Sequence, residues 1–143
     1  MVIQGANAIP DLLQIIYSSQ PFGFDDSIIG SILLDARRCN TRDDITGALV
    51  CRRDVYLQFL EGPAPAVQAA FARIARDDRH LDIKMLLSEM VPQRLFPDWA
   101  MLHDPATSWI WSPAEIQDDI LDRVKPEELR AVFTTLAARA KTA

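Results

Sequence analysis

The apolar positions of this chain follow two spacings, one typical of strands and one typical of helices. Strand-like runs occupy residues 12–18, 45–51, 55–61, 82–91 and, after a proline, 98–102. Helical spacing follows the first and the third of these runs. The expected inward positions are Ile28, Ile29, Ile32, Leu33 and Ala36 in the first helix, and Val67, Ala70, Phe71, Ile74 and Ala75 in the second. The pattern therefore predicts the order β-α-β-β-α-β-β.

Two more helices are expected after this set of elements. Ser112 and Glu115 form a capping box, with Pro113 at the first helical position. Pro126 then starts the last helix. The expected inward residues are Ile116, Ile120, Leu121 and Val124 in the first of these helices, and Leu129, Val132, Phe133 and Leu136 in the second.

This order of elements predicts an α+β fold of the ferredoxin-like split βαβ type, with both early helices on one face of the sheet. The other face would be bare and apolar, so the two C-terminal helices are expected to cover it. A chain of 143 residues is long enough for one domain with its own core. We expect residues 1–104 to form the sheet domain and residues 105–143 to form a helical extension packed on the sheet.

Composition narrows the classes of partner. A net charge of −5 and a pI near 4.9 oppose nucleic-acid binding, which usually needs a basic surface. Cys39 and Cys51 form no CxxC pair, so reduced thiols are expected and a disulfide framework or a metal site is not. No run approaches the roughly 20 apolar residues that cross a bilayer, and the first ten residues lack the basic region of a secretory signal. A cytoplasmic protein without membrane contact is expected.

Tyr17 and Gln58 are polar residues on strands that are otherwise built to be covered. On the strand at 55–61, Leu57 and Phe59 point one way, whereas Tyr56 and Gln58 point the other. A buried phenol or amide without a partner costs roughly 1–3 kcal/mol. Two interpretations stay open: the two side chains hydrogen-bond each other or nearby backbone, or they point at a ligand bound between the two helices.

Other polar residues have ordinary structural explanations. Asn40 at the end of the first helix is either a C-cap or an amide that binds a ligand. Trp99 and Met101 share one side of the last strand, where core packing is the usual role. The pair Asp43 and Asp44 is typical of a solvated turn. The chain contains no GxSxG, P-loop or GxGxxG motif. The residues alone therefore predict a ferredoxin-like domain without enzymatic turnover, and they leave open whether its buried polar side chains line a pocket between the two helices.

Six motifs, in this order and spacing, resemble the BLUF family of blue-light sensors that bind FAD. They are "IIYSS", "RRCN", "ITGALV", "YLQFLEG", "RDDRH" and "RLFPDWAM", and the resemblance runs from about residue 11 to residue 103. It implies a photoreceptor that holds FAD between the two helices. FMN or riboflavin would be alternative flavins in recombinant protein.

The resemblance also implies roles for individual residues. Tyr17 would donate an electron and a proton to the excited flavin, and Gln58 would lie between that phenol and the flavin as a hydrogen-bond switch. Trp99 and Met101 would pass the signal outward through the last strand and the C-terminal helices. The remaining flavin-binding positions implied are Ile32 and Ile74 on the ring faces, Asn40 and Cys39 beside the ring, and Arg73, Asp77, Arg79 and His80 toward the ribityl and phosphate groups.

Two positions depart from the family pattern. Asp44 stands where the family usually has a glycine, and Cys39 stands where a larger polar residue is more common. Neither touches the Tyr17–Gln58 pair. Short members of the family signal to a separate effector protein and form homodimers or larger homo-oligomers, so the same is expected here.

Two other functions are compatible with a ferredoxin-like fold. A ferredoxin-like regulatory or dimerisation module without a chromophore would use the same fold. An acylphosphatase-like hydrolase would need an arginine-bearing phosphate loop after the first strand. The segment "SSQPFGFDD" is acidic and lacks arginine, which disfavours the hydrolase.

Overall fold

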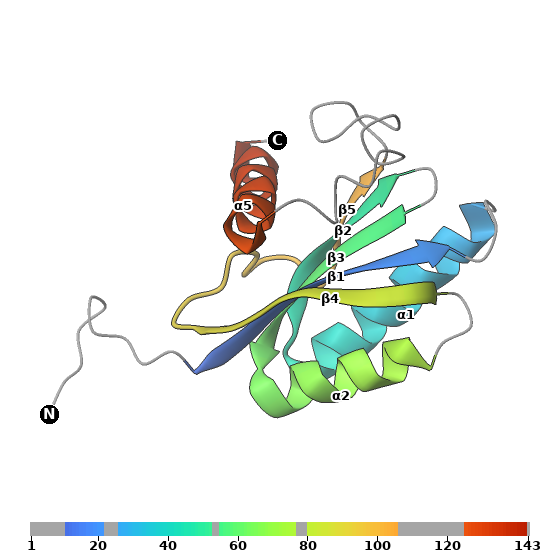
Figure 1. Cartoon of the computed structure of the whole chain (residues 1–143), viewed down its shortest axis with the longest axis horizontal. Coiled ribbons are helices and arrows are strands. Elements are labelled where there is room, and N and C mark those ends of the chain that lie inside the picture. Colours follow the sequence, from blue (N-terminus) through green and yellow to red (C-terminus); the bar gives the residue numbers. More distant parts are fainter. Residues whose placement is uncertain (1–10, 22–25, 53–54, 77–79, 106–124, 143) are drawn as a thin grey trace, which may run out of the picture.

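The computed structural model describes residues 11–21, 26–52, 55–76, 80–105 and 125–142 (Figure 1). Their strands form one sheet in the order β4-β1-β3-β2-β5. The strands are β1 (Leu12–Pro21), β2 (Thr46–Arg52), β3 (Val55–Pro63), β4 (His80–Val91) and β5 (Leu102–Pro105). The helices are α1 (Asp26–Asp43), α2 (Ala64–Ala75) and α5 (Pro126–Thr142).

The sheet topology confirms the predicted ferredoxin-like α+β fold. β1 lies between β3 and β4 and is antiparallel to both, and β2 and β3 form an antiparallel hairpin. α1 connects β1 to β2, and α2 connects β3 to β4. In both cases the two strands are parallel and a third strand lies between them, as in a split βαβ unit. β5 adds a short parallel strand to the outer edge of β2.

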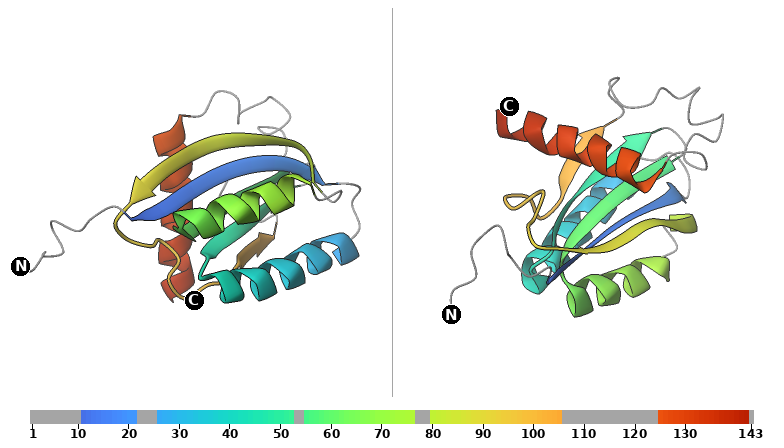
Figure 2. Two further views of the ribbon diagram at one scale, coloured as in Figure 1. Left: turned by 90° about the horizontal axis from the view of Figure 1, so that it is seen from below. Right: turned by 60° about the vertical axis from the view of Figure 1, so that its left-hand side comes forward.

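The described helices cover both faces of the sheet (Figure 1 and Figure 2). α1 and α2 lie on one face, as predicted, and α5 lies on the other. The first C-terminal helix predicted, at residues 113–124, lies outside the described residues, and the domain boundary at residue 104 stays a prediction. None of the helices that the structure describes combines the length and apolar character needed to span a membrane.

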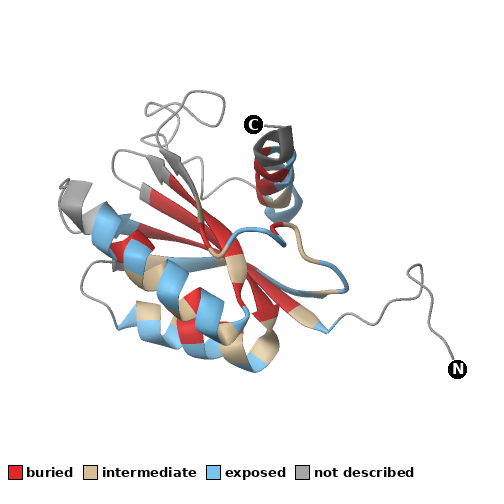
Figure 3. Ribbon diagram, turned by 180° about the vertical axis from the view of Figure 1, so that it is seen from behind, coloured by how far each residue is buried: buried red, intermediate tan, exposed pale blue. Residues whose placement is uncertain are grey.

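Two separate cores follow from the alternation of side chains along the strands (Figure 3). Tyr56 and Leu60 of β3 face α1 and α2, whereas Leu57 and Phe59 face α5. α5 contributes the apolar stripe that its spacing predicts. Its buried residues are Leu129, Phe133, Leu136 and Ala137. Ala75, expected in the core, is exposed as the last residue of α2.

The last strand predicted from the sequence was misplaced. β5 begins only at Leu102, so Trp99 and Met101 lie in the irregular segment before it and not on the strand itself. The reason is non-local: the Trp99 carbonyl accepts a hydrogen bond from the Gly47 N–H at 3.0 Å, which fixes the approach of this segment to β2. Two prolines, Pro92 and Pro97, also interrupt any longer strand.

Gly47 of β2 lies against the backbone of β3, with no room for a side chain. A Cβ atom there would lie 1.9 Å from the Phe59 carbonyl oxygen, far inside van der Waals contact. We expect Gly47→Ala to lower the free energy of unfolding by about 3 kcal/mol or more, since backbone must move to relieve the clash. Urea unfolding would measure this. Gly30→Ala is the matched control, because a Cβ at this helical position meets nothing within 4 Å and should stabilise by roughly 0.5–1 kcal/mol.

Candidate functional site

A cavity of about 150 Å³ opens on the α1/α2 face of the sheet. α1 and α2 form its walls, β3 contributes its floor, and Met101 comes from the segment before β5. The lining residues are Ile32, Asp35, Ala36, Arg38, Cys39, Asn40, Gln58, Leu60, Arg73, Ile74 and Met101. The structure therefore brings together Ile32, Cys39, Asn40, Gln58, Arg73 and Ile74, which are six of the ten flavin-binding positions that the sequence comparison with the family implied.

Except for Arg38, the residues that α1 contributes to the cavity lie on one stripe of the helix. Counting from Ile32, the lining positions at i+3, i+4, i+7 and i+8 are Asp35, Ala36, Cys39 and Asn40. Asp35 and Ala36 were not predicted as site residues, although the helical period that links Ile32 to Asn40 would have found them. Leu60 was missed as well, and it lies two residues from Gln58 on the same face of β3.

Tyr17 and Gln58 hydrogen-bond each other beneath the cavity. The two residues lie directly opposite one another on β1 and β3, and the Tyr17 hydroxyl donates to Gln58 Oε1. Tyr17 is 0% exposed and Gln58 is 2% exposed. The Tyr17 ring also packs edge-on against Phe71 of α2, with 5.2 Å between ring centroids. The phenol is thus held on both sides, and Gln58 joins it to the cavity wall.

Burial raises the pKa of Tyr17 well above its ordinary value of 10.0. The folded protein then keeps this proton at a pH where the unfolded chain loses it, so the contribution is complete below pH 10 and lost as the pH rises above it. We expect the wild-type free energy of unfolding to fall, relative to Tyr17→Phe, by about 1.4 kcal/mol per pH unit above pH 10. Denaturant unfolding of both proteins between pH 7 and 11 measures this, and parallel curves would contradict it.

Asn40 lies in the last turn of α1, before the helix ends at Asp43, and is 3% exposed. Its Nδ2 donates to the Ala100 carbonyl at 2.8 Å. Because it precedes the helix end, it is not the C-cap that the sequence left open as an alternative. Asn40 also lines the cavity, and its amide carries a second N–H and a carbonyl oxygen besides the N–H bonded to Ala100. Asn40 thereby links α1, the cavity and the segment that precedes β5.

Charged groups concentrate at the mouth of the cavity. Arg38 and Asp35 form an ion pair of 3.4 Å, with side chains 75% and 42% exposed. Arg73, from α2, is also exposed and lines the same cavity. Solvated guanidinium groups at the rim suit an anionic part of a ligand, whereas the interior is lined by apolar residues and two buried amides.

Besides Tyr17, four other predicted site residues lie elsewhere in the structure or have side chains outside the described residues. Asp77 and Arg79 lie outside the described residues. His80 is the first residue of β4 and pairs with Pro21 in the sheet register, but its side chain is not described. Trp99 is 40% exposed and does not line the cavity, whereas Met101 is 2% exposed and does.

Asp43 and Asp44 do not act as a carboxylate pair. Asp43 accepts hydrogen bonds from Arg42, which lower the pKa of its carboxyl group. Asp44 instead bonds to Arg94 at 3.1 Å and has a φ of 60°. Glycine adopts this left-handed conformation most readily, which accounts physically for a glycine being usual at this position in the family. Both carboxylates serve structure, as expected for turn residues.

Comparison with known proteins adds independent information. The family model described as sensors of blue light using FAD (BLUF) matches residues 12–102. Photoactivated adenylate cyclase subunit beta from Euglena gracilis is 30% identical over 98 residues, which cover 68% of this chain and 11% of that protein. The blue light- and temperature-regulated antirepressor BluF from Escherichia coli strain K12 is 38% identical over 61 residues, covering 43% of this chain and 15% of that protein.

Similarity to solved structures extends over most of the chain. The dark-state structure of BlrB, described as a BLUF protein, superposes with a TM-score of 0.78 at 29% identity. The match covers 90% of this chain and 97% of that one. This chain therefore spans a small part of the two curated relatives and nearly the whole of BlrB.

Proposed function

This chain belongs to the BLUF family of sensors of blue light using FAD, and we propose that it is a photoreceptor that binds FAD in the cavity between α1 and α2. One observation carries the proposal. A buried phenol, Tyr17, donates a hydrogen bond to a buried amide, Gln58, and that amide lines the cavity. When the phenol loses an electron or a proton, the hydrogen bond between the two side chains changes. A pair that served packing alone would not need to line a cavity.

The residues of the cavity fit a flavin. A flavin needs apolar walls for its rings and directional polar groups at its N–C=O edge. Ile32 and Ile74 supply apolar surface from two different helices, and Asn40 and Gln58 supply amides. Arg73 would take the phosphates, and Cys39 would lie beside the ring. FMN and riboflavin share the ring and are alternative occupants, and roles for Asp77, Arg79 and His80 stay predictions.

The bound flavin would supply the light-absorbing group, which is a strong oxidant when excited. Tyr17 is the electron and proton donor in this proposal. Its hydroxyl proton already lies on a hydrogen bond to Gln58 Oε1, so the amide is the group that responds when the phenol gives up that proton. An amide has an acceptor oxygen at one end and a donor nitrogen at the other, so its rotation or tautomerisation exchanges the hydrogen bonds that it offers to the cavity.

A purified sample tests the proposal directly. We expect yellow protein whose flavin absorption band shifts to longer wavelength under blue light and returns in the dark. Extraction of the bound flavin and chromatography against FAD, FMN and riboflavin standards would identify it. Colourless protein that takes up no added FAD would refute the proposal and favour the alternative, a ferredoxin-like regulatory or dimerisation module without a chromophore.

The output is proposed to be a signal and not a catalysed reaction. Met101 lines the cavity and Trp99 is exposed on the same segment, which supports a role for both residues in passing a change toward β5. α5, on the far face, would present that change to a separate effector protein. A homodimer or larger homo-oligomer and a cytoplasmic location complete the proposal, and size-exclusion chromatography in dark and light tests the first of these.

A further inference from the structure

A row of polar side chains crosses the α5 face of the sheet, on the side opposite the cavity. Gln14 of β1, Glu61 of β3 and Thr46 of β2 are direct neighbours in the strand register. Glu61 is central and 0% exposed. A buried carboxylate is costly unless it is fully hydrogen-bonded, so its partners identify what it is there to hold.

Four donors occupy the two oxygens of Glu61. Oε1 accepts from Gln14 Nε2 at 3.1 Å and from the Leu95 backbone N–H at 2.7 Å. Oε2 accepts from Thr46 Oγ1 at 2.8 Å and from the Phe96 backbone N–H at 2.7 Å. Both N–H groups belong to the segment between β4 and β5. Glu61 therefore fixes the backbone of that segment to the central strand β3.

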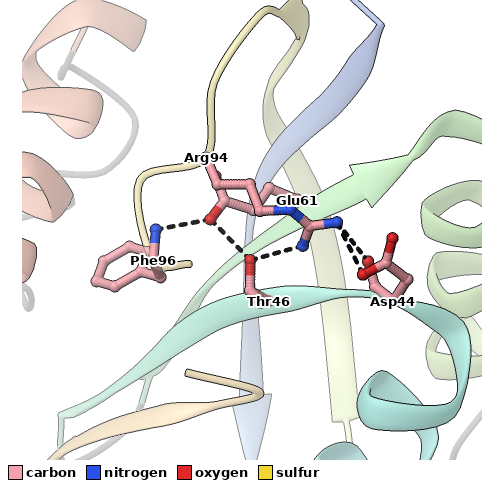
Figure 4. Close-up of polar contacts among 5 residues, drawn as sticks. All are labelled: Asp44, Thr46, Glu61, Arg94 and Phe96. Atoms are coloured by element: carbon pink, nitrogen blue, oxygen red, sulfur yellow. Dashed lines mark hydrogen bonds and ion pairs between the residues drawn. The ribbon is translucent and has the colours of Figure 1, made fainter. Parts of the chain in front are cut away.

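Arg94 completes this arrangement from the start of the same segment (Figure 4). Its guanidinium donates to Thr46 Oγ1 at 3.0 Å, and Thr46 in turn donates to Glu61. It also donates to the Asp44 carbonyl at 2.8 Å. The Thr46 hydroxyl therefore bridges the Arg94 guanidinium and the Glu61 carboxylate.

The segment of residues 94–101 contributes side chains to both cores. Phe96 is 1% exposed on the α5 face, with ring centroids 5.3 Å from Phe59 and 6.3 Å from Phe133 of α5. Met101 lines the cavity on the other face. The Ala100 and Met101 carbonyls accept hydrogen bonds from α1, through Asn40 Nδ2 at 2.8 Å and Arg37 Nε at 3.2 Å. The segment is thus held by the cavity wall at one end and by Glu61 at the other.

β3 connects the two ends directly. Gln58 faces the cavity and Glu61 faces α5, three residues apart, which is about 10 Å along a strand. A displacement of β3 at Gln58 would also displace Glu61 and, through its two hydrogen bonds, the backbone of Leu95 and Phe96, whose ring packs against Phe133 of α5.

We propose that Glu61 is a positioning residue that couples β3 to the segment of residues 94–101 and so determines whether a change at Gln58 reaches α5. The inference rests on the proposed photoreceptor function for its light-dependent part. Its structural part, the anchoring of Leu95 and Phe96, does not depend on a bound flavin.

Glu61→Gln tests the coupling, because an amide offers one acceptor oxygen and presents N–H groups toward the N–H of Leu95 or Phe96. We expect these two amides to exchange with deuterium roughly tenfold faster or more, in the dark and also in flavin-free protein. The red shift under blue light should persist, since Tyr17 and Gln58 are intact. We expect wild type to show a light-minus-dark difference in the amide exchange of α5, and Glu61→Gln should lose that difference.

Glu89→Gln is the matched control. Glu89 of β4 lies opposite Gln14 in the same row, and its carboxylate pairs with Arg130 of α5 at 3.1 Å instead of with the 94–101 segment. The same change of charge there should leave exchange at Leu95 and Phe96 as in wild type, because Glu89 contacts α5 through Arg130 and not the 94–101 segment. If Glu61→Gln does not fold, Arg94→Met removes the guanidinium but keeps the carboxylate, and should change both readouts in the same direction by a smaller factor.

Three outcomes would overturn the inference. They are unchanged exchange at Leu95 and Phe96 in Glu61→Gln and Arg94→Met, a light response of α5 that survives these substitutions, and a wild-type red shift without any light response of α5. The last would leave the photoreceptor proposal standing. A wild-type protein without any red shift would instead refute the photoreceptor proposal, and the flavin-free exchange measurement would still decide whether Glu61 anchors the segment.

Discussion

We expect Tyr17→Phe protein to be yellow and its flavin band to stay in place under blue light. Phenylalanine keeps the ring that packs against Phe71, so the cavity and its flavin should be retained. The substitution removes the hydroxyl that donates to Gln58 Oε1. Without that donor, the phenol proton that the amide responds to is absent. Difference spectra before and during illumination would show the loss of the shift.

The chain supplies a matched control for this substitution. Tyr56 is the second of its two tyrosines and is 2% exposed on the same face of the sheet. It is not the residue that donates to Gln58. Tyr56→Phe should therefore keep a red shift of wild-type size, and a normal photocycle in Tyr17→Phe would refute the donor role assigned to Tyr17.

Tyr17→Phe should also change stability in a defined direction. Removing the donor leaves a buried acceptor, Gln58 Oε1, without its partner, which costs roughly 1–3 kcal/mol at neutral pH. Above pH 10 the difference between the two proteins should shrink, because wild type loses the contribution of the buried neutral phenol. The first effect is constant between pH 7 and 10 and the second appears only above pH 10, so unfolding measurements across the range separate them.

The layers of the fold could be predicted because they depend on local periodicity. Alternation on β3 placed Leu57 and Phe59 on one face and Tyr56 and Gln58 on the other, and the structure agrees. The helical period placed Ile32 and Ile74 on the inward faces of their helices, and both line the cavity. These assignments need only the side-chain directions of a strand or a helix, which the sequence contains.

The segment before β5 could not be predicted in this way. Five residues are too few for a reliable period, and the position of the segment is set by partners far along the chain. Gly47 and Asn40 hold the carbonyls of Trp99 and Ala100, across sequence separations that no local pattern reports. Trp99 is therefore exposed and Met101 is buried, although the sequence pattern predicts both on one side of a strand.

The hydrogen-bonded carboxylate of Glu61 on the α5 face was missed for a different reason. Glu61 continues the alternation of Leu57 and Phe59, but no role was predicted for it, because a carboxylate at that position had no visible partner in the sequence. Two of its four donors are backbone N–H groups, which every residue carries and which sequence letters do not distinguish. A charged residue at a buried position of a strand was the available signal.

Gln58→Leu should abolish the red shift while leaving the cavity nearly the same size. Leucine has a similar volume and no hydrogen-bonding group, so the Tyr17 hydroxyl loses its acceptor and the cavity wall loses the amide. Gln14→Leu is the control, since Gln14 is a glutamine that is 4% exposed on the opposite face and bonds to Glu61. It should keep the red shift. A shift of normal size in Gln58→Leu would show that the amide only packs, and loss of the shift in both variants would show that the effect is not specific to Gln58. Loss in Gln58→Leu only is the result that the hydrogen bond to Tyr17 requires, because Gln58 is the residue that joins that phenol to the cavity.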